Sequence, residues 1–261
     1  MKIMGIVNVT PDSFYDGGSY LDKNKAIDRA LQMIEEGADI IDIGGESTRP
    51  GSDSISASQE IDRILPVIEV LNKKVKVPIS VDTYKSEVVE VVLQSGANII
   101  NDISGLTFDP KMGEILSAYK PGIVLMHIKG TPKDMQNKPN YSDLLGEIFS
   151  FLEKSVSKAV SFGLDKAKII IDPGVGFGKT LEDNYRIIRN LEIFKKLGVQ
   201  LLIGLSRKSL IGNLYQQEID RLPGTIALNT AAILNGADII RVHDVKEHRL
   251  ALDVLEQLNK I

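Results

Sequence analysis

The sequence predicts a (β/α)8 barrel (a TIM barrel), and three observations carry this prediction. Short β-branched runs alternate with longer amphipathic stretches along the chain, which is typical of parallel βαβ units. Eight such runs fit within 261 residues, as expected of one closed barrel. A Gly-Ala-Asp/Asn-Ile-Ile unit occurs at residues 37–41, 96–100 and 236–240, at irregular spacing, as a repeated strand entry would. We therefore expect residues 1–261 to form a single domain.

The alternation assigns each element to a range. The predicted strands are Lys2–Val9, Ala38–Ile43, Val77–Val81, Asn98–Asp102, Gly122–His127, Lys168–Asp172, Gln200–Leu205 and Ala237–Val242. The predicted helices are Lys23–Glu36, Gln59–Lys73, Ser86–Gln94, Leu144–Phe162, Leu181–Lys196 and Arg221–Asn235. In each copy of the repeat, the glycine would end a helix in the left-handed conformation and the isoleucine pair would enter a buried strand.

Composition excludes several classes of protein. The net charge is −4 and the chain has no basic arm, which argues against a nucleic-acid partner. The absence of cysteine removes disulfides, thiolate nucleophiles and zinc ribbons. No charged leader and no apolar run of membrane-spanning length is visible, so we expect a cytoplasmic protein without a membrane partner. The three histidines lack metal-ligand spacing, and we expect His248 and Asp244 to form a solvated pair on a helix surface.

Polar residues end the predicted strands. Because the carboxyl ends of parallel barrel strands meet at one face, we expect a polar pocket of mixed charge there. Three long loops that follow strands, residues 10–20, 46–58 and 129–141, would hang over this face. The polar strand ends are Asn8, Asp42, Asp82, Asn101, His127, Asp172, Ser206 and Arg241.

A glycine-rich segment at residues 172–180 is similar to nucleotide-binding loops but lacks their spacing. A Walker A loop needs glycine where Pro173 stands, and the glycines follow G-x-G-x-G, not G-x-G-x-x-G. The segment offers instead the carboxylate of Asp172, which can accept two parallel hydrogen bonds from a guanidine-like N–H edge. The glycines would form a flexible turn that lets a ligand approach the backbone.

Two segments near the end of the chain predict an anion site. Arg207 and Lys208 stand where a short helix begins, although cations oppose the helix dipole there by about 0.3–1 kcal/mol each. Cations, hydroxyls and free amides together favour an anion, although an exposed loop is the alternative. Alternation places Arg241 and His243 on one side, where barrels often hold phosphate, and the planar fork of Arg241 suits diphosphate. His243 as a simple turn residue remains the alternative.

Together these segments resemble the dihydropteroate synthase family over nearly the whole chain. The resemblance implies an enzyme that joins 6-hydroxymethyl-7,8-dihydropterin diphosphate to 4-aminobenzoate and releases diphosphate. The matching segments are NVTPDSF at 8–14, DGG at 16–18, GGESTRPG at 44–51, SVDT at 80–83, IND at 100–102, MH at 126–127, DPGVGFGK at 172–179, GLSRKS at 204–209 and RVHDV at 241–245.

The resemblance also implies roles for individual residues. The pterin would be held by Asp82, Asn101, Asp172 and Lys208, between Ile103, Met126 and Phe177, with Gly204 close to the ring. The diphosphate would be bound by Asn8, Arg241 and His243, with Asn8 also a ligand of Mg²⁺. The 4-aminobenzoate pocket would comprise Thr48, Arg49, Pro50, Phe177 and Ser209. The catalytic group would be Asp82, Lys208, Arg241, Asp12 and Arg49, with Asp12 closing over the substrates.

Two departures from the family and two competing functions accompany this hypothesis. Lys129 and Leu210 replace residues that are common in relatives, and we expect them to flank the site and to shift affinities. A homodimer is implied by the family only. The alternatives are a pterin-barrel methyltransferase, which moves a methyl group from methyltetrahydrofolate to a corrinoid protein, and a pterin-binding protein without catalytic activity. The Ser-Thr-Arg-Pro and Ser-Arg-Lys-Ser segments argue against the methyltransferase.

Overall fold

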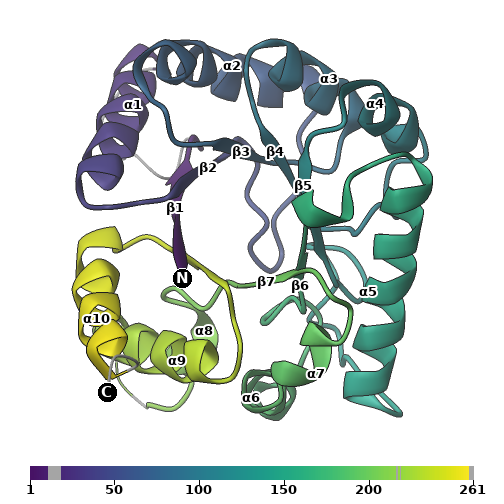
Figure 1. Ribbon diagram of the computed structural model, residues 1–261, viewed down its shortest axis with the longest axis vertical. Helices are drawn as coiled ribbons and strands as arrows, with labels where there is room; N and C mark the ends of the chain where they lie inside the picture. The colour runs from purple at the N-terminus through teal and green to yellow at the C-terminus, as the bar shows by residue number, and fades with distance from the viewer. Residues whose placement is uncertain (11–18, 216, 218, 259–261) are drawn as a thin grey trace.

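A computed structural model describes residues 1–10, 19–215, 217 and 219–258 of the chain. Within these residues, eight parallel strands close into a barrel in the order in which they occur, and β1 pairs with β8. The helices surround the barrel (Figure 1). The predicted (β/α)8 barrel is therefore confirmed. The strands are β1 (Lys2–Asn8), β2 (Ile40–Gly44), β3 (Ile79–Asp82), β4 (Ile99–Asp102), β5 (Gly122–Met126), β6 (Ile169–Asp172), β7 (Gln200–Ile203) and β8 (Ile239–Val242).

Each predicted helical range overlaps at least one helix of the structure. The predicted helix Leu181–Lys196 is divided at Asn190, where the backbone leaves the helical conformation, and the short helix Met112–Tyr119 was not predicted. Helix Met112–Tyr119 contains Gly113, and glycine disfavours a helix, which weakens the helical pattern of this segment in the sequence. A Cβ at this position would overlap the ring of Phe162, so packing requires the glycine. The helices are α1 (Ser19–Glu35), α2 (Ala57–Lys74), α3 (Ser86–Gln94), α4 (Met112–Tyr119), α5 (Leu144–Ser161), η2 (Lys166–Lys168), α6 (Leu181–Arg189), α7 (Glu192–Lys195), α8 (Ser209–Gly212), α9 (Leu222–Leu234) and α10 (Val245–Leu258).

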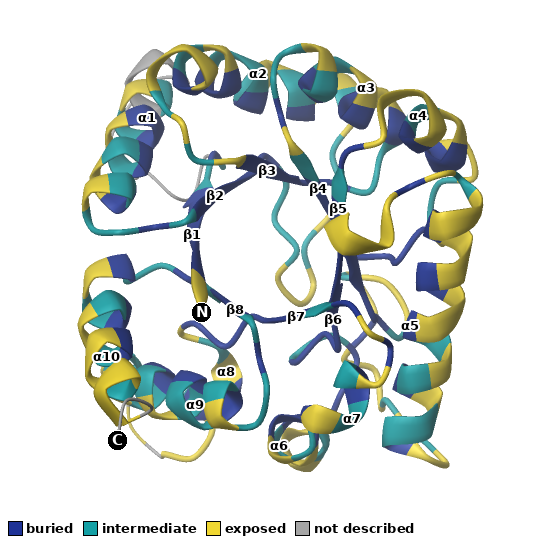
Figure 2. Cartoon of the chain, viewed as in Figure 1, coloured by how far each residue is buried: buried dark blue, intermediate teal, exposed yellow. Residues whose placement is uncertain are grey.

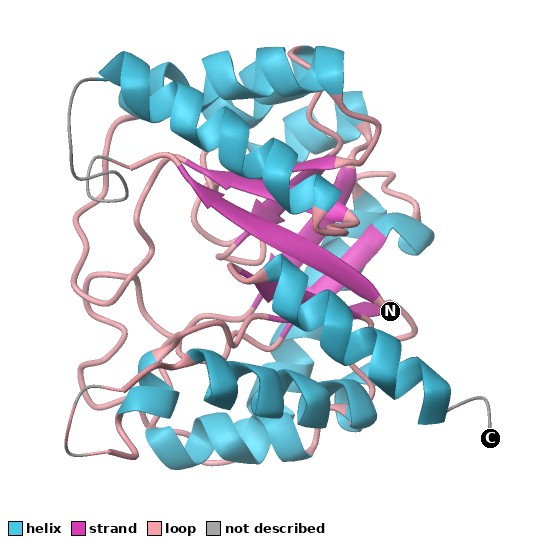
Figure 3. Cartoon of the chain, turned by 90° about the vertical axis from the view of Figure 1, so that its left-hand side faces the viewer, coloured by secondary structure: helices cyan, strands magenta, loops and turns pink. Residues whose placement is uncertain are grey.

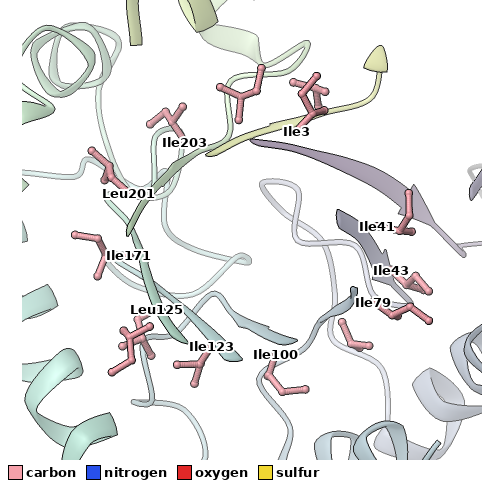
Figure 4. Close-up of a cluster of buried hydrophobic side chains, with 14 of the residues drawn as sticks. Ile3, Ile41, Ile43, Ile79, Ile100, Ile123, Leu125, Ile171, Leu201 and Ile203 are labelled. Atoms are coloured by element: carbon pink, nitrogen blue, oxygen red, sulfur yellow. The ribbon is translucent and has the colours of Figure 1, made fainter. Parts of the chain in front are cut away.

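The two faces of each strand serve different cores. Outward-facing side chains of the strands pack against the helices in one large cluster (Figure 4), and the buried faces of the helices turn toward the barrel (Figure 2). Inward-facing side chains form a smaller apolar layer inside the barrel. Since side chains alternate along a strand, the next inward positions lie one layer closer to the strands' carboxyl ends. The apolar layer comprises Met4, Ile40, Val124, Ile170, Leu202 and Ile239.

The long loops gather at the carboxyl ends of the strands, and the N-terminus lies at the opposite end of the barrel (Figure 3). The apolar layer closes the barrel beneath this face, as in other barrels of this kind. Helices of the described ranges include none that is long and apolar enough to cross a membrane.

His248 differs from its predicted environment. It is 2% exposed, not solvated, and its Nε2 lies 2.9 Å from the Nδ2 of the buried Asn229. Its Nδ1 lies 2.6 Å from the backbone oxygen of Asp244. The prediction of a solvated pair with Asp244 is therefore wrong. Helix α9 places a buried amide against α10, and a buried amide needs a hydrogen-bond partner.

The glycines of the repeat adopt the conformation that the sequence predicts. Gly37, Gly96 and Gly236 have φ of +100°, +105° and +102°, a region that side chains disfavour. Each follows a helix and leads into the next strand. The repeated unit is thus a turn between helix and strand that glycine makes possible.

We expect Gly96→Ala to destabilise the fold more than Gly163→Ala. Both glycines have positive φ, but a Cβ at Gly96 would also overlap the side chain of Asn72, whereas at Gly163 the nearest atom is Lys120 Cε at 3.7 Å. Left-handed strain alone costs about 1–2 kcal/mol, and overpacking adds about 1–3 kcal/mol. Urea unfolding of the two variants measures the difference, and equal losses would contradict the packing explanation.

Candidate active site

A cavity of about 920 Å³ opens at the carboxyl ends of the strands. Met135 of the β5–α5 loop and Glu46 of the β2–α2 loop also line it, so the second and third long loops reach this face as predicted. Of the predicted site residues, Asn101, Ile103, Met126 and Asp172 do not line it; they lie buried at the same ends of the strands. The predicted residues that line the cavity are Asn8, Thr48, Arg49, Pro50, Asp82, Phe177, Gly204, Lys208, Ser209, Arg241 and His243.

Arg241 joins two buried carboxylates at the centre of the barrel. Its Nε donates to Asp42 Oδ2 at 2.6 Å and its Nη2 donates to Asp82 Oδ2 at 2.7 Å. Asn101 Nδ2 also donates to Asp42 Oδ2, at 3.0 Å. These residues occupy inward positions of β8, β2, β3 and β4 directly above the apolar layer. The residues predicted for pterin and for diphosphate are therefore linked through one guanidinium.

Asp42 was noted as a polar strand end but received no role from the sequence. It is fully buried and serves both Arg241 and Asn101. The signal that identifies it is the alternation on β2, which places it on the same inward side as Asp82 on β3. Asp42 therefore holds both Arg241, which lines the cavity, and the buried amide of Asn101.

One oxygen of Asp82 remains an available acceptor. Its Oδ1 is buried and has no hydrogen-bond partner among the described residues, although Oδ2 is paired with Arg241. Burial raises the pKa of the Asp82 carboxyl to about 7, and the Arg241 guanidinium acts in the opposite direction. A buried acceptor without a donor costs free energy, so a ligand N–H at this position is favoured.

Asp172 and Lys208 carry opposite charges that act on each other. Asp172 Oδ1 accepts from Gly174 N at 2.7 Å, and burial raises its pKa while the Lys208 ammonium lowers it. Lys208 donates to the backbone oxygen of Val175, and its Nζ lies 4.8 Å from the centre of the Phe177 ring. Burial lowers the pKa of Lys208 to about 8. A cation and an aromatic face thus line one side of the cavity, and the buried carboxylate of Asp172 acts on that cation.

An apolar cluster lies beside these charges. Ile103 and Met126, which the resemblance assigns to the pterin pocket, pack with Ile128 and Met135. Phe177 packs against this cluster and also lines the cavity. The arrangement gives a flat ring an apolar surface next to buried carboxylates.

The β8 end presents a neutral histidine and a cation. Ser206 Oγ lies 2.9 Å from His243 Nδ1, and burial lowers the pKa of His243 to about 4. Arg207 is not free to bind a ligand anion, because its Nε and Nη2 already donate to the carboxylate of Asp244 at 2.8 and 2.7 Å. Of the two adjacent cations in the predicted anion site, Arg207 is therefore paired within the protein.

The β2–α2 loop is anchored at its base. Glu46 accepts hydrogen bonds from Tyr84 Oη at 2.8 Å and from Ile55 N at 3.0 Å, and it forms an ion pair with Lys85. These contacts tie both ends of the loop to the segment after β3. The exposed residues Arg49 and Pro50 are thereby held at the edge of the cavity.

The structure corrects two predictions about neighbouring residues and part of a third. His127 does not face the main cavity: with Lys129 it lines a separate depression of about 590 Å³. Leu210 belongs to the core between strands and helices, so neither departure from the family flanks the site. Of the glycines after β6, Gly174 and Gly178 let protein backbone approach, because a Cβ there would overlap the carbonyl oxygen of His127 or Lys129, whereas Gly176 lines the cavity. The remaining catalytic prediction, Asp12, lies outside the described residues.

A parallel barrel that gathers buried acids, cations and an apolar surface at its carboxyl face has the arrangement of an enzyme. Residues 4–243 match the family described as pterin binding enzyme, and the chain belongs to this family.

The chain is similar to dihydropteroate synthases along almost its entire length. It is 48% identical to dihydropteroate synthase of Bacillus subtilis over 262 residues, which cover 99% of this chain and 89% of the relative. The structure of the Yersinia pestis dihydropteroate synthase with a sulfonamide drug complex superposes with a TM-score of 0.94 at 41% identity, covering 100% and 94% of the chains. The Xanthomonas albilineans dihydropteroate synthase with 4-aminobenzoic acid gives 0.93 at 41% identity, covering 100% and 93%.

We expect Asp42→Ala to destabilise the protein by about 3 kcal/mol or more, because it leaves the half-buried Arg241 and the buried Asn101 without their shared acceptor. The free energy of unfolding in urea measures this loss. Asp53→Ala is the matched control, since it breaks an exposed ion pair with Lys133 and should have no measurable effect. A loss no larger than that of the control would show that Asp42 does not hold the centre of the barrel.

Proposed function

We propose that this protein catalyses the dihydropteroate synthase reaction, in which 4-aminobenzoate displaces diphosphate from 6-hydroxymethyl-7,8-dihydropterin diphosphate. The full-length likeness to dihydropteroate synthases carries this proposal. The buried carboxylates, the cations and the apolar cluster of the cavity are chemically suited to such substrates. No observation favours the methyltransferase, and the inactive-binder alternative is tested by turnover.

We assign the pterin ring to the space beside Asp172, Asn101 and Asp82. The ring carries a guanidine-like edge, whose parallel N–H groups suit the carboxylate of Asp172. The apolar cluster that contains Ile103 and Met126, with Phe177 packed against it, would cover the faces of the ring. Gly204 leaves room near Lys208, because the nearest atoms to a Cβ there lie 3.9–4.0 Å away.

The reaction breaks the bond between the methylene carbon and the diphosphate oxygen and forms a bond from that carbon to the amine nitrogen. The pterin ring spreads the positive charge that develops as diphosphate departs, and we assign the stabilisation of this charge to Asp82. The aromatic amine is neutral at pH 7 and nucleophilic, so it needs no activating base before attack. It releases one proton after the new bond forms.

We assign the diphosphate to Asn8, Arg241 and His243, which line one part of the cavity. Asn8 fits a Mg²⁺ site because an amide oxygen, together with water and substrate phosphate oxygens, is a ligand set that Mg²⁺ accepts. Bound Mg²⁺ would neutralise charge on the departing diphosphate. Arg241 would bind the same anion through its planar guanidinium.

We assign 4-aminobenzoate to the edge of the cavity formed by Thr48, Arg49, Pro50, Phe177 and Ser209. The guanidinium of Arg49 suits the carboxylate of this substrate. Closure of the first loop with Asp12 would complete the site, so the pterin substrate would bind first.

The same proposal includes one domain over residues 1–261, a cytoplasmic location and a homodimer. Apolar side chains that are exposed on and around α9 and α10 support the dimer, because exposed apolar patches mark interaction surfaces. They are Leu214, Tyr215, Leu234, Leu250, Val254 and Leu258.

Diphosphate release from the dihydropterin substrate tests the reaction. We expect release to require 4-aminobenzoate and to match dihydropteroate formation. Arg49→Ala should lower turnover and leave pterin binding nearly unchanged. Binding of the substrate without any release would contradict the proposed function and favour an inactive binder.

We expect kcat/KM for the pterin substrate to fall as the pH rises through about 8, because the buried Lys208 loses its proton there. In Lys208→Arg the guanidinium stays protonated, so this alkaline decline should disappear even if the rate is lower. Lys133→Arg on the exposed surface is the control and should retain the decline. An unchanged decline in Lys208→Arg would contradict the assignment.

A further inference from the structure

Lys179 is a buried cation that the proposed reaction does not use. It follows the glycine-rich turn after β6 and is 2% exposed. Its Nζ lies 2.9 Å from the backbone oxygen of Phe177, 3.0 Å from His127 Nδ1 and 3.3 Å from the backbone oxygen of His127. An ammonium has three N–H donors, and these three acceptors of the described chain occupy all of them. A buried charge with this set of partners is held in one position.

The contacts of Lys179 lead to Asp172 through the backbone. The His127 carbonyl that accepts from Lys179 lies against Gly174, where a Cβ would overlap it. Gly174 N donates to Asp172 Oδ1 at 2.7 Å, and His127 N donates to the backbone oxygen of Asp172 at 3.0 Å. Lys179 therefore holds the turn after β6 against the end of β5, and this turn orients the Asp172 carboxylate.

The charges of Lys179 and Asp172 also act on each other. Burial lowers the pKa of Lys179 well below its usual range, and the Asp172 carboxylate opposes this effect. Burial raises the pKa of Asp172, and Lys208, Lys179 and Arg241 lower it. The other charged groups that act on Lys179 are Lys208, Asp183 and Lys129. Removal of the Lys179 charge would therefore favour the protonated form of Asp172.

We propose that Lys179 is a positioning residue for pterin binding: it clamps the turn after β6 onto the end of β5 and so holds Asp172 in the orientation and the ionised form that accept the ring. This inference rests on the proposed function, which assigns the pterin to Asp172. It gives a role to the Gly-Lys-Thr sequence that is similar to a nucleotide-binding loop but lacks its spacing.

Calorimetric titration with 6-hydroxymethyl-7,8-dihydropterin diphosphate and Mg²⁺ tests the inference on the full chain. Lys179→Met keeps the length of the side chain but removes its charge and donors, and it should weaken binding by about tenfold or more. The deficit should be larger at acidic than at alkaline pH, because Asp172 is then more often protonated. Lys154→Met removes an exposed lysine near the second depression and should bind like the wild type.

A double variant separates positioning from general damage to the fold. In the Asp172→Asn background, Lys179→Met should weaken binding by less than about twofold, since the group through which it acts has been replaced. His127→Leu removes one acceptor of Lys179 and should also weaken binding. His127→Asn keeps an acceptor near the same place and should restore most of the affinity. This pair provides the test if Lys179→Met does not fold.

The outcomes distinguish the inference from the proposed function. If the wild type binds, Asp172→Asn binds poorly and Lys179→Met binds like the wild type, the inference is wrong and the function stands. If the losses of affinity of the two single variants multiply in the double variant, the inference is also wrong. If Asp172→Asn binds like the wild type, the assignment of the pterin to Asp172 in the proposed function is itself wrong, and the inference falls with it.

Discussion

A guanidinium held between two buried carboxylates is the constraint on which the rest of this site depends. Arg241 cannot remain charged at the centre of the barrel without acceptors, and Asp42 and Asp82 supply them at 2.6 and 2.7 Å. Asn101 is then fixed by the same oxygen of Asp42. These side chains lie one step above an apolar layer that fills the barrel. The apolar core fixes the register of the strands, and the inward-facing residues one step above it form the polar centre.

This arrangement explains how one cavity can serve unlike substrates. Of the buried carboxylates, Asp82 lines the cavity, where we propose that a flat, hydrogen-bonding ring enters, and the β8 end presents Arg241 with the neutral His243. The β2–α2 loop brings Arg49 to the rim, and its base is fixed by Glu46. The rigid strands therefore carry the groups proposed to bind pterin and diphosphate. A loop carries those proposed for the second substrate.

The barrel could be predicted from the sequence because its strands and turns are determined by residues close together in the chain. The left-handed glycines Gly37, Gly96 and Gly236, each before a buried strand, are examples. Alternation and polar strand ends also predicted which face carries the cavity. The sequence did not predict the pairing of Arg207 with Asp244, the burial of His248 or the clamp at Lys179. Each of these depends on which side chain of another segment the fold brings into contact with the residue. Spacing along the chain does not contain that information.

The most direct test of the account is a crystal structure of the protein with 6-hydroxymethyl-7,8-dihydropterin diphosphate. In this structure the guanidine-like edge of the ring should lie on Asp172, and the diphosphate should lie beside Asn8 and His243. Arg241 should keep its hydrogen bond to Asp42 while its outer nitrogens reach the diphosphate. A ring bound away from Asp172, or Arg241 released from Asp42, would contradict the central role given to these buried charges.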